Sequence, residues 1–431
     1  MRKTAPRKVA ILCPTSIPWI SLCIDGIRRF AREQGGWHLF SSPPTMHGTG
    51  ESALNIRSMR GWKGDAVIVL SSEEKELRYA HRIGLPVVNL GGGSAKSYGV
   101  PRVMVNHHKA GRMAADHLLG RGLRHLAFFG WQDLWYSDQR QMGFIGRARE
   151  AGVECEVLLR TSRLESNQNW PQRIASLTRW LVSLPRPVGI FAVQDYRAQF
   201  LIEACQEAGL RIPADIAVVG MDNNEAVCDH LAPTLSSVSR SSQKVGWEAA
   251  ALLDRILRGM KLPLEDVLID PDGVVARQST AMQYSENPVV QNALDYMRER
   301  LREQFNISAV AEHSKASKRT LEMRFRESLG SSPHSFLTKL RVQRAEHLLG
   351  LPQKLSIGEI ANQCGFGTAT TFYAAFRRVT GQSPASFRRQ SGRPDRDRVS
   401  DPLMWAAARS GPRSMTLLGS GPARKGSRSR P

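Results

Sequence analysis

The chain has 431 residues, of which 41% are hydrophobic, and it carries a formal net charge of +21. This length suffices for two or three domains with buried cores, and no apolar run approaches the roughly 20 residues that a membrane-spanning helix needs. About two thirds of the positive excess falls after residue 286. A local excess of this kind is typical of a protein that binds a polyanion, although a merely basic surface is the alternative.

The six cysteines are scattered along the chain without a C-x-x-C pair. This spacing argues against a zinc site and against the disulfide framework of a secreted protein. The apolar run near the N-terminus is too short for a signal peptide. We therefore expect a cytoplasmic protein, associated with the nucleoid if its polyanion is DNA, without a metal, a cofactor or a membrane partner.

Short apolar segments alternate with amphipathic ones from Val9 to about Tyr284. The predicted strands are 9–14, 37–40, 65–70, 86–90, 102–105, 125–130, 188–193 and 216–220, and the predicted helices lie near 20–33, 109–120, 139–151, 171–183, 196–208 and 242–259. This alternation predicts parallel sheets covered by helices on both faces. About eight strands are many for one sheet, so we predict two doubly wound α/β lobes with a cleft beyond the carboxyl ends of their strands.

The composition changes after this region. Residues 285–291 (SENPVVQ) are predicted to be a junction, and the chain from there to about residue 390 has a helical pattern. The basic tail, 391–431, is rich in Arg, Ser, Gly and Pro and is predicted to be disordered. The predicted domains are therefore an α/β domain at 1–284, an all-α domain at 285–390, and this tail.

An internal repeat lies in the all-α region, where GSSPHSFLTKLR at 330–341 is echoed by GQSPASFRRQ at 381–390. Each copy ends a unit of a short helix, a tight turn and a second helix, at about 307–329 and 356–380, which is the pattern of a helix-turn-helix. Gly330 and Gly381 are expected to end the second helices, and each Ser-Pro to start a third. A separate helix at 341–349 is expected to join the two units.

The stretch GFGTATTFYAAFRRVTGQSPASFR (365–388) closely resembles the signature of AraC-type DNA-binding domains. In that family the second helix of each unit lies in a major groove of double-stranded DNA. The resemblance implies base-facing positions at Lys318, Arg319, Glu322, Met323, Thr368, Ala369, Thr370, Tyr373 and Ala374, and phosphate contacts from Arg377, Arg378 and Arg388. For any one of these arginines, a solvated helix face is the alternative.

The α/β domain resembles LacI-type effector domains, which share the fold of periplasmic sugar-binding proteins. The resemblance rests on the segments HHKAGRMAADHLLGRGLRHLAFFG (107–130), RQMGF (140–144), FAVQD (191–195) and VVGMDNNE (218–225). Followed by an AraC-type domain, it gives the domain order of the xylose-operon regulators. It implies a monosaccharide effector held between the lobes by Ser16, Trp19, Asn106, Arg140, Trp170, Gln194, Asp195 and Asp222, with Trp131, Trp135 and Tyr136 as an aromatic wall.

Some of these positions have a structural alternative. Trp131 and Trp170 can pack in a core, and Asp222 can cap a helix. His107 and His108 are predicted to lie on the surface rather than to bind a metal. Asn106 and Ser21 stand where the family commonly has Asp and Arg, and the loss of two partners for sugar hydroxyls puts xylose itself in doubt.

The sequence thus predicts a sequence-specific transcription regulator, with the resemblance favouring a homodimeric activator that works with RNA polymerase under control of a sugar such as xylose. A DNA binder whose first domain has lost its ligand and only dimerises is the alternative. An enzyme is disfavoured because the chain has no G-x-G-x-x-G, P-loop or G-x-S-x-G motif.

Overall fold

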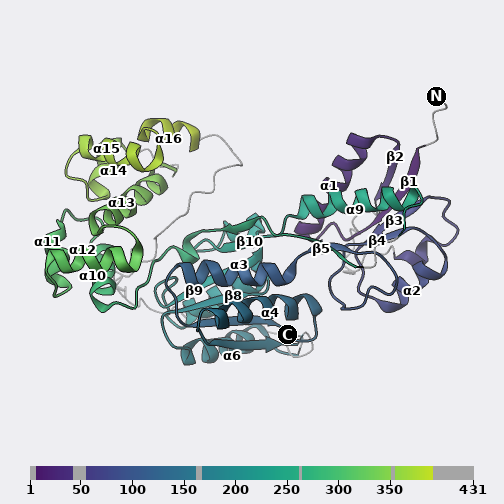
Figure 1. The fold of residues 1–431 in the computed structure, drawn as a ribbon, viewed down its shortest axis with the longest axis horizontal. Coiled ribbons are helices and arrows are strands. Elements are labelled where there is room, and N and C mark those ends of the chain that lie inside the picture. The colour runs from purple at the N-terminus through teal and green to yellow at the C-terminus, as the bar shows by residue number, and fades with distance from the viewer. Residues whose placement is uncertain (1–5, 42–54, 162–166, 262–264, 351–354, 392–431) are drawn as a thin grey trace, which may run out of the picture.

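The computed structural model describes residues 6–41, 55–161, 167–261, 265–350 and 355–391. Its three parts follow one another along the longest axis of the molecule: an N-terminal lobe, a C-terminal lobe and a helical domain (Figure 1). All but the first residue of the predicted tail, 391–431, lies outside the described residues. Within them, no helix is long and apolar enough to cross a membrane.

The N-terminal lobe is built on a parallel sheet with the strand order β2-β1-β3-β4. Its strands are β1 (Arg7–Leu12), β2 (Trp37–Ser41), β3 (Ala66–Val69) and β4 (Val87–Asn89). Helices α1 (Pro18–Gln34) and α9 (Ser242–Leu257) share one core with this sheet, and α2 (Glu74–Arg82) packs into a second core. Helix α9, far away in sequence, therefore completes the first lobe (Figure 1).

The C-terminal lobe contains a six-stranded sheet in the order β12-β10-β9-β8-β6-β7. Its strands are β6 (Leu126–Trp131), β7 (Cys155–Arg160), β8 (Val188–Ala192), β9 (Ile216–Asp222), β10 (Ser236–Ser239) and β12 (Gly273–Val275). Helices α3 (His107–Gly120) and α4 (Trp135–Glu150) cover one face, and α6 (Trp170–Ser183) and α7 (Asp195–Glu207) the other. Both lobes thus have the predicted doubly wound architecture.

The chain crosses between the lobes at three adjacent segments. One includes β5 (Val103–Val105), which pairs in parallel with β11 (Val267–Ile269) in another, and the third leads from β10 into α9. The segments are tied together, because the backbone N–H of Asn106 donates to the Ile269 carbonyl at 2.7 Å and the Ser241 hydroxyl donates to the Asp270 carbonyl at 2.8 Å. This bundle of crossovers is where the lobes can hinge.

Two close helix crossings shape the lobes. A Cβ on Gly111 of α3 would lie 2.0 Å from the Arg140 carbonyl oxygen, and one on Gly143 of α4 would lie 2.0 Å from the His108 carbonyl oxygen. In the same way α1 and α9 meet through Gly26 and Gly246, where an added Cβ would be about 2 Å from a facing carbonyl oxygen. These glycines are required because any side chain would push the two backbones apart.

The helical domain contains two cores of similar design. Its helices are α10 (Pro288–Glu299), α11 (Ile307–His313), α12 (Lys318–Leu329), α13 (Pro333–Gly350), α14 (Ile357–Gln363), α15 (Ala369–Thr380) and α16 (Pro384–Ser391). Leu321 and Phe325 of α12 are buried in the first core, and Phe372 and Phe376 of α15 in the second. Gly330 and Gly381 end these helices in the left-handed region, with φ of 64° and 76°.

Two expectations about this domain need correction. The third helix of the first unit and the predicted joining helix at 341–349 are one continuous helix, α13, because no Gly or Pro interrupts 334–349; Leu340 packs in the first core and Ala345 in the second. The predicted junction at 285–291 is already helical from Pro288, since the Asn287 side chain caps α10 by accepting from two backbone N–H groups.

Several strands were not predicted. Strand β7, CEVLLR, lies at the sheet edge and has an apolar run of only three residues between Glu156 and Arg160, and β10 is the short, serine-rich SSVS. Neither gives the continuous apolar signal of a buried parallel strand. Strands β11 and β12 and helix α2 (Glu74–Arg82) were also not predicted, and all three are short.

Candidate effector cleft and nucleic-acid interface

A cleft of about 1150 Å³ opens between the two lobes. Its walls come from the segments that follow the strands of both sheets, from the start of α1 and from the crossover before α9. The carboxyl ends of parallel strands are the usual place for a ligand in such folds. Five of the predicted effector residues line it from three segments: Ser16 and Trp19 at the start of α1, Gln194 and Asp195 at the start of α7, and Asp222 at the end of β9.

Asp222 is held between two guanidinium groups. Its Oδ1 lies 3.1 Å from Nη1 of Arg240 and 3.6 Å from Nη2 of Arg140. The φ of Asp222 is 109°, which L-residues rarely adopt. The N-cap position of the following short helix, α8 (Glu225–Cys228), is Asn224 rather than Asp222. The helix-cap alternative for Asp222 is therefore wrong, and its carboxylate instead joins two buried cations.

Arg240, which was not among the predicted effector residues, contacts both lobes. It lies in the crossover between β10 and α9, and its guanidinium stacks 3.7 Å above the ring centre of Trp19 on α1. Only 7% of Arg240 is exposed, and its Nε has no hydrogen-bond partner among the described residues. The close crossing of α1 and α9 brings Trp19 and Arg240 together, a long-range contact that no local pattern shows.

Arg140 was predicted to contact the ligand at the edge of the cleft, but it lies behind the cleft instead. Its side chain is 1% exposed and is not part of the cleft wall. Nε donates to Nδ1 of His107 at 3.2 Å, and Nη1 donates to the Val193 carbonyl. Burial lowers the pKa of Arg140 to about 10, so it remains a cation at neutral pH. Its role in this geometry is to support the groups that face the ligand.

His107 was predicted to lie on the surface, but it is 3% exposed and lines the cleft. The start of α3 buries it against α4, whereas its neighbour His108 is exposed as expected. Burial, together with the charges of Arg140 and Arg240, holds the pKa of His107 well below its ordinary value. The ring is therefore neutral. Because Nδ1 accepts from Arg140, the proton resides on Nε2, which has no partner within the described part of the chain.

Asp195, the first residue of α7, has its carboxylate occupied. It accepts from the Ser237 hydroxyl at 2.6 Å and from the Asn224 backbone N–H at 2.7 Å. Burial, with a further contribution from the charge of Asp222, raises the pKa of Asp195 to about 7. The adjacent Gln194 accepts from Nε1 of Trp131 at 3.2 Å. Both side chains are thus held in place before any ligand binds.

Two predicted effector residues do not line the cleft. Asn106 caps α3 by accepting from the Lys109 N–H at 2.9 Å, so its side chain is used at the hinge. Trp170 is 51% exposed and packs on Phe200 with ring centres 5.0 Å apart, which fits the packing alternative. Sequence placed Asn106 at a strand end and Trp170 at a helix start, but neither pattern says which way the side chain points.

The predicted aromatic wall is represented in the cleft by Tyr136. Trp131 instead holds Gln194, and Trp135 packs beside Arg102, whose guanidinium carbon is 5.4 Å from its ring centre. The cleft wall also contains Gly91, Gly92 and Gly93, which were not among the predicted effector residues. A triple glycine after a strand has the appearance of a simple turn, and only the fold shows that it faces His107.

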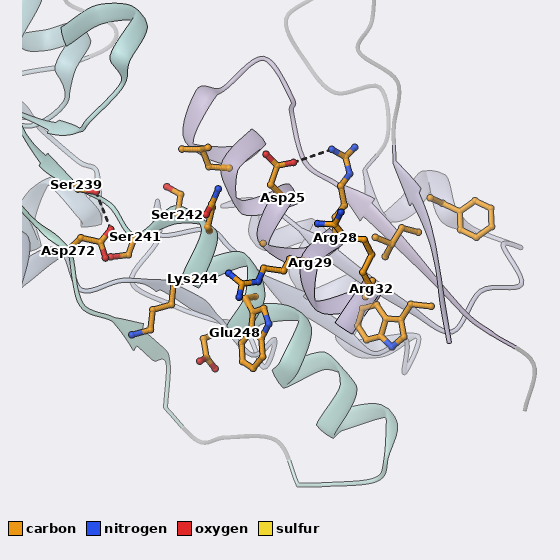
Figure 2. A pocket seen from close by; sticks show the side chains of 18 of the residues that line it. Asp25, Arg28, Arg29, Arg32, Ser239, Ser241, Ser242, Lys244, Glu248 and Asp272 are labelled. Atoms are coloured by element: carbon orange, nitrogen blue, oxygen red, sulfur yellow. Dashed lines mark hydrogen bonds and ion pairs between the residues drawn. The ribbon is translucent and has the colours of Figure 1, made fainter. Parts of the chain in front are cut away.

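A second groove of about 1320 Å³ lies between α1, β2 and the start of α9 and extends to Ser239 and Asp272. Figure 2 shows that its arginines, Arg28, Arg29 and Arg32, come from α1, and that Lys244 of α9 also lines it. Arg28 pairs with Asp25 at 3.3 Å and Arg29 with Glu33 at 2.7 Å, and both arginines are more than half exposed. Charges in water bind a small ligand weakly, so the inter-lobe cleft is the better effector site.

The predicted base-facing residues are all exposed on the second helices of their units. On α12 these are Lys318, Arg319, Glu322 and Met323; on α15 and its cap they are Thr368, Ala369, Thr370, Tyr373 and Ala374. Met323 is 47% and Tyr373 40% exposed, which is unusual for large apolar side chains and fits a surface that meets a partner. The Thr368 hydroxyl also caps α15 by accepting from the Thr371 N–H at 3.1 Å.

The three arginines assigned to phosphate differ in their surroundings. Arg377 and Arg378 are exposed in the last turn of α15. Arg388 on α16 is half-buried, and its Nη2 donates to the Leu355 carbonyl at 2.7 Å. Arg388 therefore fastens α16 to the segment before α14, a structural role that the sequence did not predict.

A compact joint connects the C-terminal lobe with the helical domain. The Tyr284 N–H donates to the Arg121 carbonyl at 2.7 Å, and the Tyr284 hydroxyl donates to the Pro213 carbonyl. Arg298 of α10 is 5% exposed and donates to the Gln283 carbonyl. Gly122, at φ 83°, leaves room for this segment, since a Cβ there would lie 2.1 Å from the Tyr284 carbonyl oxygen. The first helix of the helical domain is thus attached to the lobe by buried polar contacts.

Two protein-family models match the chain. A periplasmic binding protein-like domain matches residues 115–280, and a helix-turn-helix domain matches residues 310–390. The first covers most of the C-terminal lobe and the second both helix-turn-helix units. They agree with the two domain types that the sequence motifs indicated.

Curated relatives match over nearly the whole chain. The xylose operon regulatory protein of Haemophilus influenzae is 28% identical over 388 residues, covering 88% of this chain and 98% of that protein. That of Escherichia coli K12 is 26% identical over 396 residues, covering 89% and 97%. These relatives are regulators rather than enzymes, so the prediction of a regulator is confirmed.

Solved structures share the fold. A structure described as the xylose-binding transcription activator xylR aligns with a TM-score of 0.63 and 24% identity, covering 90% of this chain and 99% of that chain. A complex of the transcriptional regulator CelR with cellobiose aligns with a TM-score of 0.53 and 22% identity, covering 64% and 85%. At these identities the likeness concerns the fold.

Proposed function

Since the chain is an AraC-type DNA-binding regulator with a periplasmic-binding-protein-like effector domain, similar to the xylose operon regulators, we propose that a small polyhydroxylated ligand in the inter-lobe cleft controls where its two helix-turn-helix units bind. The observation that carries the proposal is the cleft itself. It combines the aromatic rings of Trp19 and Tyr136 with a buried arginine and a buried histidine that have unused hydrogen-bonding capacity, next to a hinge.

The joint at Tyr284 and Arg298 supports a path from the cleft to the DNA. The residues that contact the joint, Arg121 and Pro213, belong to the C-terminal lobe, so a change in lobe orientation moves the base of α10 as well. A ligand shifts such a balance only through its different affinity for the open and closed lobes. In this proposal the protein is a homodimer, and closure changes the spacing of its DNA-binding domains.

The finer assignments follow the relatives. The names of two relatives connect them with the xylose operon, and the similar structure is described as a xylose-binding activator. We therefore propose transcription activation, through contact with RNA polymerase, in response to a sugar related to xylose. The interface in this proposal consists of the exposed residues of α12 and α15, with Arg377 and Arg378 on phosphates.

An electrophoretic shift on DNA from upstream of the protein's own gene tests the proposal. Binding at about 100 mM salt with competitor DNA, altered by one member of a sugar panel, is the expected result. The matched control is Trp170→Ala, which removes an exposed aromatic ring outside the cleft. Absence of a shift at every salt concentration and with every ligand would overturn it.

The second candidate is a DNA binder whose effector domain only dimerises. The replacement of the family's usual residues at Asn106 and Ser21 favoured it in the sequence. Against it, His107 and Arg240 keep unpartnered donors in the cleft, and burying unpaired polar groups costs about 1–3 kcal/mol each. A domain that only dimerised would have no reason to keep this cost.

A further inference from the structure

The unused hydrogen-bonding atoms at the base of the cleft are both donors. Nε2 of His107 and Nε of Arg240 are buried N–H groups without a partner among the described residues, and both residues line the cleft. His107 cannot act as an acceptor at Nε2, because Arg140 donates to Nδ1 and fixes the tautomer. The ligand atoms that meet these two groups must therefore be acceptors.

Three carboxylate oxygens in the same region, Oδ1 of Asp222 and both oxygens of Asp195, already face donors. Asp222 is bound by Arg240 and lies next to Arg140, and Asp195 receives the Ser237 hydroxyl and the Asn224 N–H. A sugar hydroxyl that accepts from His107 would still need a hydrogen-bond acceptor for its own proton. A carboxylate has no proton to donate and therefore needs no acceptor.

Glycines line the cleft beside His107. A Cβ on Gly92 would lie 3.0 Å from Nε2 of His107, and one on Gly93 would lie 3.0 Å from the Ser72 Cβ. A side chain at Gly92 would therefore cover the free N–H of His107. The short distance also places the glycine wall directly opposite the free N–H.

We propose that the effector is an acidic monosaccharide, an aldonic or uronic acid, whose carboxylate accepts from His107 Nε2 and from the Arg240 guanidinium. This inference rests on the proposed function, since it names the ligand class of the same cleft. It also assigns His107 and Arg240 as specificity-determining residues. The Trp19 ring, which already covers Arg240, then borders the apolar face of the sugar.

The acidic residues at the mouth of the cleft do not oppose this arrangement. Asp25 is exposed and pairs with Arg28 at 3.3 Å, and Glu225 is exposed at the start of α8. Charges in water are screened over about 8–10 Å at physiological salt. The buried groups at the base act on the ligand with much less screening.

Calorimetric titration of the full-length protein with matched neutral and acidic sugars tests the inference. The pairs are D-xylose with D-xylonate, and D-galactose with D-galacturonate. The acid of at least one pair is expected to bind about tenfold or more tightly than its neutral partner, as charge-assisted hydrogen bonds are the stronger ones. The same acid should alter the electrophoretic shift of the upstream DNA.

Two variants assign the effect to the named side chains. Arg240→Gln and His107→Phe should each reduce the acid-to-neutral preference about tenfold, while Arg29→Gln, on the exposed face of α1, should leave it unchanged. Circular dichroism and DNA binding without ligand show whether each variant is folded. If one variant does not fold, the other still tests the inference.

The outcomes separate this inference from the proposed function. Tighter binding of a neutral sugar, or equal binding of both members of every pair, overturns the acidic ligand but leaves a sugar-controlled regulator intact. Binding of none of the four sugars, with DNA binding preserved, overturns the acidic ligand and favours a domain that only dimerises.

Discussion

Replacing Arg140 by methionine tests the architecture of the cleft most directly. The side chain is 1% exposed, and it holds His107, the Val193 carbonyl and one side of Asp222. Methionine fills much of the same volume without a charge or a donor. The variant therefore isolates the polar contacts from the packing.

The expected loss is about 3–5 kcal/mol of unfolding free energy for the effector domain. Removing one partner of a buried ion pair costs about this much, and each buried acceptor left without a donor costs about 1–3 kcal/mol. The lower part of the range applies if Asp222, which keeps Arg240 at 3.1 Å, re-forms its contacts. In the control Arg29→Met, an exposed pair with Glu33 at 2.7 Å is lost, and the expected change is below about 0.5 kcal/mol.

Urea unfolding followed by tryptophan fluorescence measures both variants. Eight of the nine tryptophans lie before residue 250, so the signal reports mainly on the two lobes. Because the chain has several domains, the effector-domain transition must be fitted separately. If Arg140→Met lowers the unfolding free energy by less than about 1 kcal/mol, the support role is refuted and a direct contact between Arg140 and the ligand is favoured.

The remaining predictions concern pH, coupling and DNA. Because the pKa of His107 is depressed in the folded protein, its contribution to stability is present above the unfolded pKa of about 6.5 and is lost as pH falls. Between pH 6.5 and 5, urea titrations should show that the wild type loses up to about 2 kcal/mol more unfolding free energy than His107→Phe. Equal losses in both proteins would contradict a buried neutral ring. Arg298→Met should keep effector affinity but abolish the effect of the ligand on the electrophoretic shift; an unchanged response would show that the joint does not carry the signal. Arg377→Ala should weaken binding to all DNA sequences and lower the salt slope by about one, whereas Arg319→Ala should change the preferred sequence in a selection assay; the reverse pattern would exchange their roles.

The fold could be predicted from the sequence because most of its helices and strands follow from local residue patterns. Apolar strands separated by amphipathic helices indicate doubly wound sheets, and the Gly–Ser–Pro repeat marks the ends of both recognition helices. The prediction failed for β7 and β10, which are an edge strand and a serine-rich strand, and for α13, where the repeat suggested a break that the helix does not have.

The cleft was harder to predict because its chemistry comes from helix crossings. His107 meets Arg140 since Gly111 and Gly143 let α3 and α4 touch, and Trp19 meets Arg240 since Gly26 and Gly246 do the same for α1 and α9. A motif identifies Arg140 and Asp222 as candidates, but it cannot tell a residue that faces the ligand from one that supports it. Burial and hydrogen-bond partners decide that question.

The position of Arg240 connects ligand recognition with movement of the lobes. Its backbone is in a crossover, its guanidinium stacks on Trp19 of the N-terminal lobe, and it pairs with Asp222 of the C-terminal lobe. The next residue, Ser241, has a φ of 56° and bonds to the crossover that contains Asp270. A ligand carboxylate that competes with Asp222 for this guanidinium therefore acts on a contact between the lobes. In this geometry the Arg240 guanidinium both distinguishes an acidic from a neutral sugar and contacts both lobes at the hinge. Replacing Arg240 should therefore change ligand affinity and the ligand's effect on DNA binding together.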